Sequence, residues 1–313
     1  YHVQTLGGSV VDTATISLWG RISNACVSYL LYVGKLIWPI RLAVLYPHPG
    51  SWSAHLTLLS LAAIVAALVW TWRRRREAPW EMVGVLWFLG TLLPVIGLIQ
   101  IGWHAMADRF VYVPAIGLYV VLVWSLSTWL GQRTKRLQIA GFLLAIVVVV
   151  ALLSRTRNQV SLWHDSIALF SHATAITRDN WMMHNCCGAA LARAGRDAQA
   201  IPHFESAIRL RPERPRAHYN LGCVKFRQQK WPEAIQLFST SAEIFPSHKT
   251  LYNLAAAQKQ NGQFSNAEKT YLLLLDRSPN HTPSMNNLGC LYRELEQYDK
   301  AVALFDRAIA TDS

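Results

Sequence analysis

Long apolar runs in the first half of the chain constrain its fold more than any other feature. A helix needs about 20 mostly apolar residues to cross the roughly 30 Å of hydrocarbon in a bilayer. A weaker segment, residues 17–38, contains Arg21, Asn24 and Lys35, so it either spans the membrane, re-enters it or lies in the interface. Four clearer spans are predicted at residues 53–72, 80–101, 110–130 and 137–154. The first half is therefore predicted to be a polytopic membrane helix bundle.

The charge distribution separates this membrane part from the rest of the chain. The net charge of +12 divides into +9 for residues 1–158 and +3 for residues 159–313. Two short basic loops, residues 73–76 and 133–136, contribute much of the excess, and short basic loops face the cytosol. We therefore expect residues 102–109, and all that follows the last span, on the extracytoplasmic side. Topology and contact with the lipid bilayer explain the positive charge, so no nucleic acid is expected as a partner.

The second half has a repeat of about 34 residues. Anchors that end in a small residue recur at this spacing, with alanine 12 residues later and an aromatic residue 16 residues later. This pattern is typical of the tetratricopeptide repeat (TPR), a pair of helices joined by a turn. The signature positions are Gly188, Ala200, Phe204, Pro212, Leu221, Gly222, Ala234, Phe238, Pro246, Leu254, Ala267, Tyr271, Pro279, Leu288, Gly289, Ala301 and Phe305. The predicted fold class is all-α, a transmembrane bundle followed by a TPR solenoid.

The repeat also predicts the limits of each unit and the turn inside it. The array comprises a half-unit at residues 159–180 and full units at 181–214, 215–247, 248–281 and 282–313. The turns between paired helices fall at Gly195, Gln229, Gly262 and Glu296. Because the chain starts at Tyr1 and the last unit stops at Ser313 without a polar capping helix, we expect a fragment whose array continues.

Cysteine and histidine usage indicates neither a disulfide framework nor a metal site. Cys186, Cys187, Cys223 and Cys290 fall in the first helices of repeats, where free cysteine acts as a small apolar residue. The 11 histidines form no cluster at zinc-ligand spacing, so no metal is expected. Phosphate-loop, dinucleotide and nucleophile-elbow motifs are not found in the sequence, and no cofactor is predicted.

One polar cluster lies between two predicted spans, in the segment Gly102–Tyr112. Charged residues at membrane depth are unfavourable and usually face a cavity or a partner. Asp108 and Arg109 are therefore either snorkelling charges or a local ion pair, or they belong to an anion site. Arginine suits an anion site because its planar guanidinium binds phosphate oxygens in pairs. The candidates for phosphate binding are Arg109, His104 and Tyr112, with Asp108 as a structural partner.

Residues around this loop carry a resemblance to a known family. The segments are Leu86–Leu98, Ala105–Gly117 and Leu45–Gly50. Their most specific part comprises Ala107, Asp108, Arg109, Tyr112 and Pro114. Here the chain resembles bacterial membrane proteins that join a glycosyltransferase-like core to a C-terminal TPR array. Those proteins are similar to the animal transmembrane and tetratricopeptide O-mannosyltransferases, and the resemblance covers essentially the whole chain.

The resemblance implies a class C membrane glycosyltransferase. Such an enzyme takes sugar from a polyprenyl- or dolichyl-phosphate donor and transfers it to protein on the extracytoplasmic face. The family's catalytic acid lies in the first outer loop. Asp12 is the only acidic residue before Glu77, so no catalytic residue is assigned and the chain alone is expected to be inactive. The TPR groove would bind the acceptor polypeptide, extended or helical, or a partner protein.

A non-enzymatic membrane scaffold is the main alternative, so enzyme activity stays open. In a scaffold the bundle would only anchor a peptide-binding array, and a transporter or channel is a third interpretation. An outer loop with Asp or Glu soon after the first span would favour the enzyme, whereas a native start near Tyr1 would favour the scaffold. The array would lie in the periplasm of a bacterium, which the resemblance favours, or in the endoplasmic reticulum lumen of a eukaryote.

Overall fold

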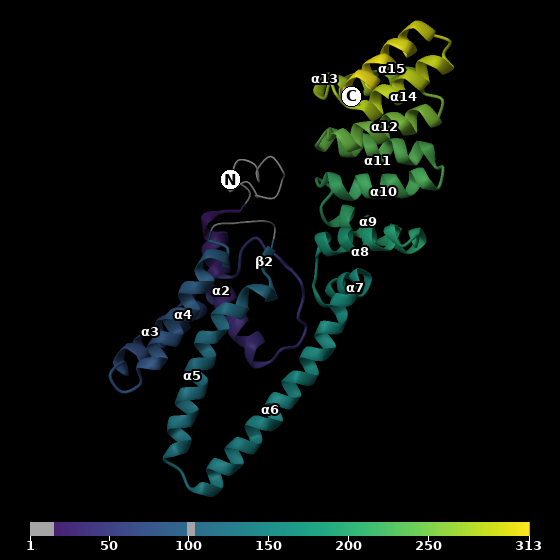
Figure 1. Ribbon diagram of the computed structural model, residues 1–313. Helices are drawn as coiled ribbons and strands as arrows, with labels where there is room; N and C mark the ends of the chain where they lie inside the picture. The colour runs from purple at the N-terminus through teal and green to yellow at the C-terminus, as the bar shows by residue number, and fades with distance from the viewer. Residues whose placement is uncertain (1–15, 99–103, 313) are drawn as a thin grey trace. The chain divides into compact units, whose positions relative to one another are not determined.

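The structure is a computed structural model that describes residues 16–98 and 104–312 (Figure 1). The described chain is almost entirely helical, which confirms the all-α prediction. It divides into two compact units, one ending at Asn180 and the other beginning at Trp181. This boundary lies later than the predicted one at residue 158, because the helix there runs on to Ser161 and the Asn180 amide donates to the Leu45 carbonyl at 3.1 Å. The predicted half-unit, residues 159–180, therefore belongs to the first unit.

The first unit consists of helices and one short strand pair. Its elements are α2 (Leu18–Ile37), β1 (Tyr46–Pro47), α3 (Ala54–Arg73), α4 (Pro79–Leu92), η1 (Leu93–Val95), β2 (His104–Met106), η2 (Asp108–Val111), α5 (Tyr112–Gly131), α6 (Lys135–Ser161), η3 (Leu162–His164) and α7 (Ser166–Ile176). β1 and β2 pair antiparallel, with Tyr46 opposite Met106. This pairing brings together the segments that precede α3 and α5.

Three helical segments of the described chain are long and apolar enough to cross a membrane. They are Ala54–Arg73, Asp108–Gly131 and Lys135–His164. Each overlaps one predicted span. Ser53 begins the first of them by accepting a hydrogen bond from the Leu56 backbone N–H, which satisfies a donor that the helix itself leaves free.

The predicted span at residues 80–101 differs from the structure. α4 covers 14 residues and ends at Leu92, and only the short helix η1 continues it to Val95. Pro94 has no N–H to continue the hydrogen-bond ladder, and Gly97 has a φ of +99°, which a right-handed helix excludes. Apolar composition continues past these two residues, but helical backbone does not. Residues 99–101 lie outside the described chain.

The segment predicted at residues 17–38 forms one helix, α2, with a buried polar face. The Asn24 amide donates to the Ala105 carbonyl at 3.1 Å and to the Ile96 carbonyl at 3.4 Å. The Tyr32 hydroxyl pairs with the backbone carbonyl and N–H of Ala107, both at 3.1 Å. Irregular backbone at membrane depth is tolerated only where protein or water satisfies its polar groups. The polar residues of α2 thus satisfy the non-helical segment before η2.

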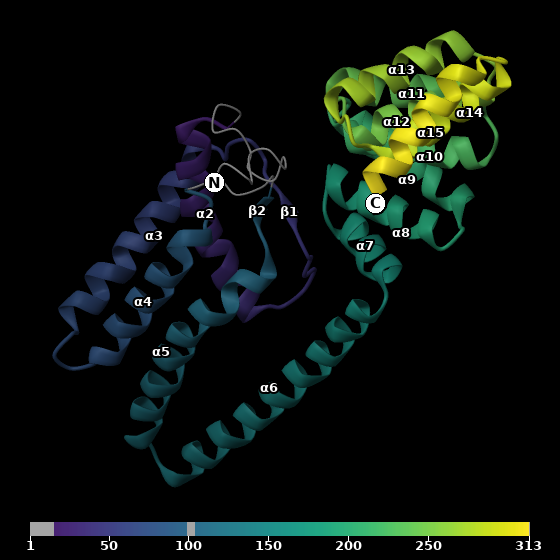
Figure 2. The ribbon, with the colours of Figure 1, turned by 45° about the horizontal axis from the view of Figure 1, so that its top comes forward.

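Close packing of α4 against α5 depends on two glycines (Figures 1 and 2). A Cβ built on Gly84 would lie 2.3 Å from the carbonyl oxygen of Gly117, and the reverse distance is also 2.3 Å. Small residues at such crossings let helix backbones approach closely in membrane proteins. The buried core beside them includes Tyr32, Leu92 and Ile96.

The second unit consists of stacked helix pairs (Figure 1). Its helices are α8 (Trp181–Arg193), α9 (Asp197–Leu210), α10 (Pro215–Arg227), α11 (Trp231–Ile244), α12 (His248–Gln260), α13 (Phe264–Arg277), α14 (Thr282–Glu294) and α15 (Tyr298–Asp312). Each predicted full unit contains one pair. Pro212, Pro246 and Pro279 each follow the end of a second helix by two residues, consistent with their inability to continue it.

The four turns inside the pairs share one backbone conformation. The φ angles are +73° at Gly195, +60° at Gln229, +74° at Gly262 and +61° at Glu296. This left-handed conformation favours glycine and costs other residues roughly 1 kcal/mol. Two of the four turns therefore carry strain that glycine would relieve.

Glycine in the first helix makes room for the aromatic ring of the second. A Cβ built on Gly222 would lie 2.7 Å from the Phe238 ring, closer than real Cβ contacts allow. The same contact joins Gly188 with Phe204 and Gly289 with Phe305. In the third unit Ala255 and Tyr271 take these places, and both are fully buried. The small and aromatic residues at these places thus pack against each other inside the array.

Candidate functional site

The polar site of the first unit is organised by one tyrosine. The Tyr46 hydroxyl lies 2.9 Å from Asp108 Oδ2, and it accepts from Lys35 Nζ and from the Ala43 backbone N–H, both at 2.7 Å. It also lies 3.0 Å from the Arg41 carbonyl. A phenol has one proton and two lone pairs. Because two donors occupy the lone pairs, the proton faces the carboxylate and the carbonyl, and the charged acceptor makes the stronger bond. We call Lys35, Tyr46 and Asp108 the Tyr46 cluster.

The Tyr46 side chain stays protonated in this cluster. Burial, followed by the nearby Asp108 carboxylate, raises the pKa of the Tyr46 hydroxyl. The phenol therefore keeps its proton and remains a donor to Asp108. The hydroxyl links the end of α2, the strand β1 and the start of η2, so it fixes the segment that carries Arg109.

The structural partner of Asp108 is Tyr46 and not the adjacent Arg109. A local ion pair between Asp108 and Arg109 was one interpretation of the sequence. Within residues 16–98 and 104–312, no carboxylate oxygen lies within 4 Å of the Arg109 guanidinium, and the Asp108 carboxylate bonds Tyr46 instead. The Arg109 guanidinium is exposed, with its carbon 5.1 Å from the centre of the Phe110 ring. Its charge is therefore available to an anion from outside the chain.

The other two phosphate-binding candidates are less defined. Tyr112 is the first residue of α5 and is 73% exposed, and within the described chain it makes no hydrogen bond to Arg109. His104 has its backbone in β2, opposite Pro47, while its side chain lies outside what the structure describes. Sequence reasoning missed Lys35 and Tyr46 as site residues. The Leu45–Gly50 segment carried the available signal, because it formed part of the family resemblance.

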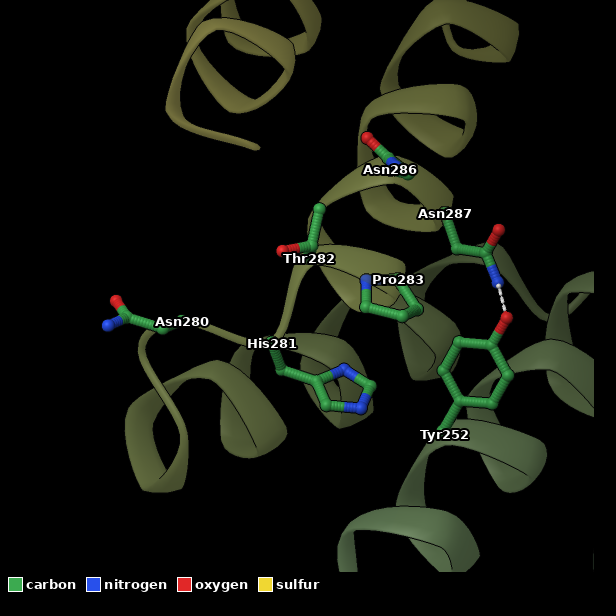
Figure 3. A pocket seen from close by; sticks show the side chains of 7 residues that line it. All are labelled: Tyr252, Asn280, His281, Thr282, Pro283, Asn286 and Asn287. Atoms are coloured by element: carbon green, nitrogen blue, oxygen red, sulfur yellow. Dashed lines mark hydrogen bonds between the residues drawn. The ribbon is translucent and has the colours of Figure 1, made fainter. Parts of the chain in front are cut away.

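The array contains an uncharged pocket between α12 and α14 (Figure 3). Its volume is about 540 Å³. Amides, hydroxyls and one imidazole line it, and Asn287 Nδ2 donates to the Tyr252 hydroxyl at 2.9 Å across it. The lining residues are Tyr252, Asn280, His281, Thr282, Pro283, Asn286 and Asn287. Such a lining offers hydrogen bonds and no counter-charge.

The pocket histidine is held neutral by its surroundings. Burial, followed by the nearby His248, lowers the pKa of His281. The His281 Nδ1 lies 2.8 Å from the Ser284 hydroxyl, so the ring is also fixed in orientation. A neutral, oriented imidazole adds hydrogen-bonding capacity without attracting anions.

A second histidine pair lies inside the first repeat. His184 Nδ1 lies 3.2 Å from His203 Nδ1, and Cys187 Sγ lies 3.6 Å from His203 Nε2. Burial lowers the pKa of both histidines. At His184, repulsion from a charged His203 lowers the pKa further. Sequence spacing did not reveal this pair, because the two residues lie on different helices. Among the described residues, no group of three or more His, Cys, Asp or Glu side chains is arranged to hold a metal ion.

Comparison with known proteins confirms the repeat prediction. Residues 188–249 and 246–313 match two models of the tetratricopeptide repeat. A solved structure of MamA from Desulfovibrio magneticus RS-1 is 19% identical, with a TM-score of 0.46, over 52% of this chain and 94% of that chain.

The chain is also similar to curated protein O-mannosyl-transferases. It is 24% identical over 196 residues to the Protein O-mannosyl-transferase Tmtc3 of Drosophila melanogaster, covering 62% of this chain and 21% of the relative. It is 26% identical over 216 residues to the Protein O-mannosyl-transferase TMTC1 of Homo sapiens, covering 66% of this chain and 23% of the relative. The chain thus spans about a fifth to a quarter of the length of these relatives. Both matches are longer than the whole array, residues 181–313, so they include part of the first unit.

Proposed function

We propose that this chain is part of a multi-pass membrane glycosyltransferase that transfers sugar from a polyprenyl-phosphate donor to protein. The extent of the similarity to protein O-mannosyl-transferases carries this proposal. A TPR array alone matches proteins of many functions, whereas these matches extend into the membrane unit. The proposal includes a class C membrane fold and a bacterial source.

The reaction we propose is a displacement at the anomeric carbon of the donor sugar. A carboxylate elsewhere in the full-length protein takes the proton of an acceptor hydroxyl, whose oxygen forms the new glycosidic bond. The bond between the anomeric carbon and the lipid phosphate breaks, and the phosphate leaves with its electrons. This chain supplies no catalytic base in the proposal and is inactive by itself.

Arg109 is the residue of this chain that we place at the donor phosphate. Its guanidinium is exposed, unpaired by any carboxylate among the described residues, and located where η2 meets α5. A positioned arginine stabilises the negative charge that develops on a departing phosphate. The Tyr46 cluster acts indirectly, because it holds Asp108 and therefore the backbone that carries Arg109.

We place the loop 102–109 and the array on the extracytoplasmic side of the membrane. The pairing of β1 with β2 supports a common side of the membrane for the segments before α3 and α5. The basic loops at residues 73–76 and 133–136 favour the cytosol for the opposite ends of these helices. In this arrangement the array binds the acceptor polypeptide close to the donor side. The compartment is the periplasm in a bacterium, or the endoplasmic reticulum lumen in a eukaryote.

The second candidate is a membrane-anchored scaffold without transferase activity. The TPR match and the uncharged pocket of the array favour it, because TPR grooves bind polypeptides. In that case the bundle only anchors the array, and Arg109 contributes nothing to a reaction.

The experiment that tests the proposal is Arg109→Ala in the full-length protein, reconstituted in nanodiscs. The measurement is transfer of radiolabelled mannose from a polyprenyl-phosphate donor to an acceptor polypeptide. We expect transfer to fall by about 10²-fold, because the arginine acts on charge that develops in the transition state. Equal transfer by wild type and variant would remove Arg109 from the donor site.

The matched control is Arg133→Ala, at the opposite end of α5. Arg133 is also exposed and stacks on an aromatic ring, with its guanidinium carbon 4.8 Å from the Trp129 ring centre. We expect this variant to keep wild-type transfer. A full-length wild-type protein that transfers no sugar, but binds polypeptide, would support the scaffold instead.

A further inference from the structure

The pocket between α12 and α14 combines rings with amides in its lining (Figure 3). The Tyr252 and His281 rings meet edge to face, with their centres 5.9 Å apart, and the Pro283 ring lines the pocket with them. Figure 3 shows the amides of Asn280 and Asn286 apart from these rings. The pocket therefore offers both apolar surface and polar groups, and its volume of about 540 Å³ lies within the usual range for small-ligand sites.

The amides of the pocket have hydrogen-bonding capacity that the chain does not use. Within residues 16–98 and 104–312, the Asn280 and Asn286 side chains make no hydrogen bond, and both are exposed. Each amide carries two N–H donors and a carbonyl oxygen with two lone pairs. At His281 the bond to Ser284 uses Nδ1, so Nε2 offers one more hydrogen bond, as donor or acceptor according to the tautomer. Such a mixture suits hydroxyl groups, because each hydroxyl both donates and accepts.

The start of α14 favours a neutral ligand over an anion. A helix N-terminus binds anions through backbone N–H groups that the helix leaves free. Here the Thr282 N–H donates to the Asn280 carbonyl and the Ser284 N–H to the His281 carbonyl, both at 3.0 Å. Pro283 has no N–H. The first three residues of α14 therefore keep no free N–H for a phosphate or a carboxylate, and the lining adds no charged side chain.

A second cavity adjoins the pocket and extends it. Its volume is about 500 Å³, and it shares Asn280 and His281 with the pocket while adding Arg277, Ser278 and Pro279. The Arg277 guanidinium donates to a backbone carbonyl of the preceding repeat at 3.4 Å. A ligand larger than one ring can therefore place its ring in the pocket and continue into the second cavity.

We propose that this pocket binds a neutral pyranose sugar carried by a polypeptide. A pyranose has an apolar C–H face, which suits the rings of Tyr252 and His281, and hydroxyls around its edge, which suit the amides of Asn280 and Asn286. The chain that carries the sugar would follow the second cavity. The proposal rests on the sugar transfer given under the proposed function, and it adds a site that retains the glycosylated product.

This site would make binding depend on the sugar as well as on the polypeptide. A polypeptide that has received one sugar would be held more tightly than before, so further hydroxyls on the same polypeptide could react before it is released. The alternative is that the pocket contacts only the polypeptide, or no ligand. Two peptides of identical sequence, with and without one sugar, separate these interpretations.

The experiment uses the full chain in nanodiscs and a fluorescein-labelled peptide with one α-linked mannose on a central threonine, with fluorescence anisotropy as the measurement. The comparison peptide has the same sequence without mannose. We expect the glycopeptide to bind roughly tenfold more tightly or better, since each of two added hydrogen bonds strengthens binding about fivefold. Methyl α-mannopyranoside should displace the glycopeptide, and inorganic phosphate at the same concentration should not. These comparisons need no variant, so they hold even where a variant fails to fold.

The variants locate the sugar site. Asn280→Ala and Asn286→Ala should each weaken glycopeptide binding about fivefold and leave binding of the plain peptide unchanged. Asn266→Ala, an exposed asparagine on α13, is the matched control and should bind as wild type.

The proposal is overturned if the glycopeptide does not bind, if the two peptides bind equally, if phosphate displaces the glycopeptide as well as the mannoside does, or if neither pocket variant weakens binding. The synthetic glycopeptide needs no transfer activity, so its binding is unaffected if the proposed transferase activity fails. Failure of the sugar site likewise leaves Arg109-dependent transfer untouched.

Discussion

Removal of the Tyr46 hydroxyl should destabilise the first unit more than its single oxygen atom suggests. Tyr46→Phe keeps the ring and deletes the group that accepts from Lys35 and Ala43 and donates to Asp108. Lys35 retains the Arg41 carbonyl at 3.3 Å, but Ala43 and Asp108 lose a partner. All three cluster residues are half-buried, so water replaces part of what is lost.

The expected magnitude follows from the kinds of hydrogen bond involved. A hydrogen bond to a charged group contributes about 1.5–3 kcal/mol and a neutral one about 1 kcal/mol, and partial hydration reduces these values. We expect Tyr46→Phe to lower the free energy of unfolding by about 3 kcal/mol. Asp108→Asn keeps the shape and an acceptor oxygen, so it should lower it by only about 1 kcal/mol.

The assay is reversible unfolding in mixed micelles by titration with sodium dodecyl sulfate, followed by far-ultraviolet circular dichroism. The double variant should be little less stable than Tyr46→Phe, because Asp108 has already lost its partner, which gives a coupling of about 1 kcal/mol. Tyr119→Phe is the control, since Tyr119 is 50% exposed on α5. Either of two results would refute the reasoning: a Tyr46→Phe effect below about 0.5 kcal/mol, or fully additive effects of the two substitutions.

The array offers two further tests, one at its turns and one at its buried histidines. Gln229→Gly and Glu296→Gly should each raise the free energy of unfolding by about 0.5–1 kcal/mol, as measured by urea unfolding. Gly195→Ala and Gly262→Ala should each lower it by about 1 kcal/mol. Effects of the same sign at all four turns would contradict the argument. Because burial lowers the pKa of His184 and His203 below the ordinary histidine value of about 6.5, the unfolded chain binds protons first as the pH falls. The melting temperature should therefore decrease below about pH 6.5, and less steeply in His203→Gln, whereas an equal decrease in both proteins would assign the effect elsewhere.

The array was predictable from the sequence because each of its contacts is local. The pairing of Gly222 with Phe238 spans one unit, and the positive φ angles at Gln229 and Glu296 follow from the same register as the glycines at the other turns. A solenoid repeat contacts only its neighbours, so a period in the sequence becomes a period in space. The four predicted units each contain a helix pair for this reason.

The first unit was less predictable because apolar composition does not determine backbone geometry. Hydropathy extends past Pro94 and Gly97, although α4 ends at Leu92. The polar residues of α2 made it a weaker candidate for a membrane span. Asn24 and Tyr32 are nevertheless buried, and they donate hydrogen bonds to backbone carbonyls far along the chain. Such long-range polar contacts leave no periodic trace in a sequence.

The two polar sites respond differently to substitution because their contacts differ in arrangement. In the Tyr46 cluster one hydroxyl serves Lys35, Ala43 and Asp108, so a single substitution removes every contact together. In the array, the hydrogen bonds from Asn253 to Tyr219 and from Asn287 to Tyr252 each join only two adjacent repeats, so a substitution at Asn253 leaves the contact at Asn287 in place. The stability of the array should therefore change in steps with the number of intact asparagine contacts, whereas the position of Arg109 depends on a contact that is either made or lost. A periodic site can thus tolerate sequence change that the Tyr46 cluster cannot.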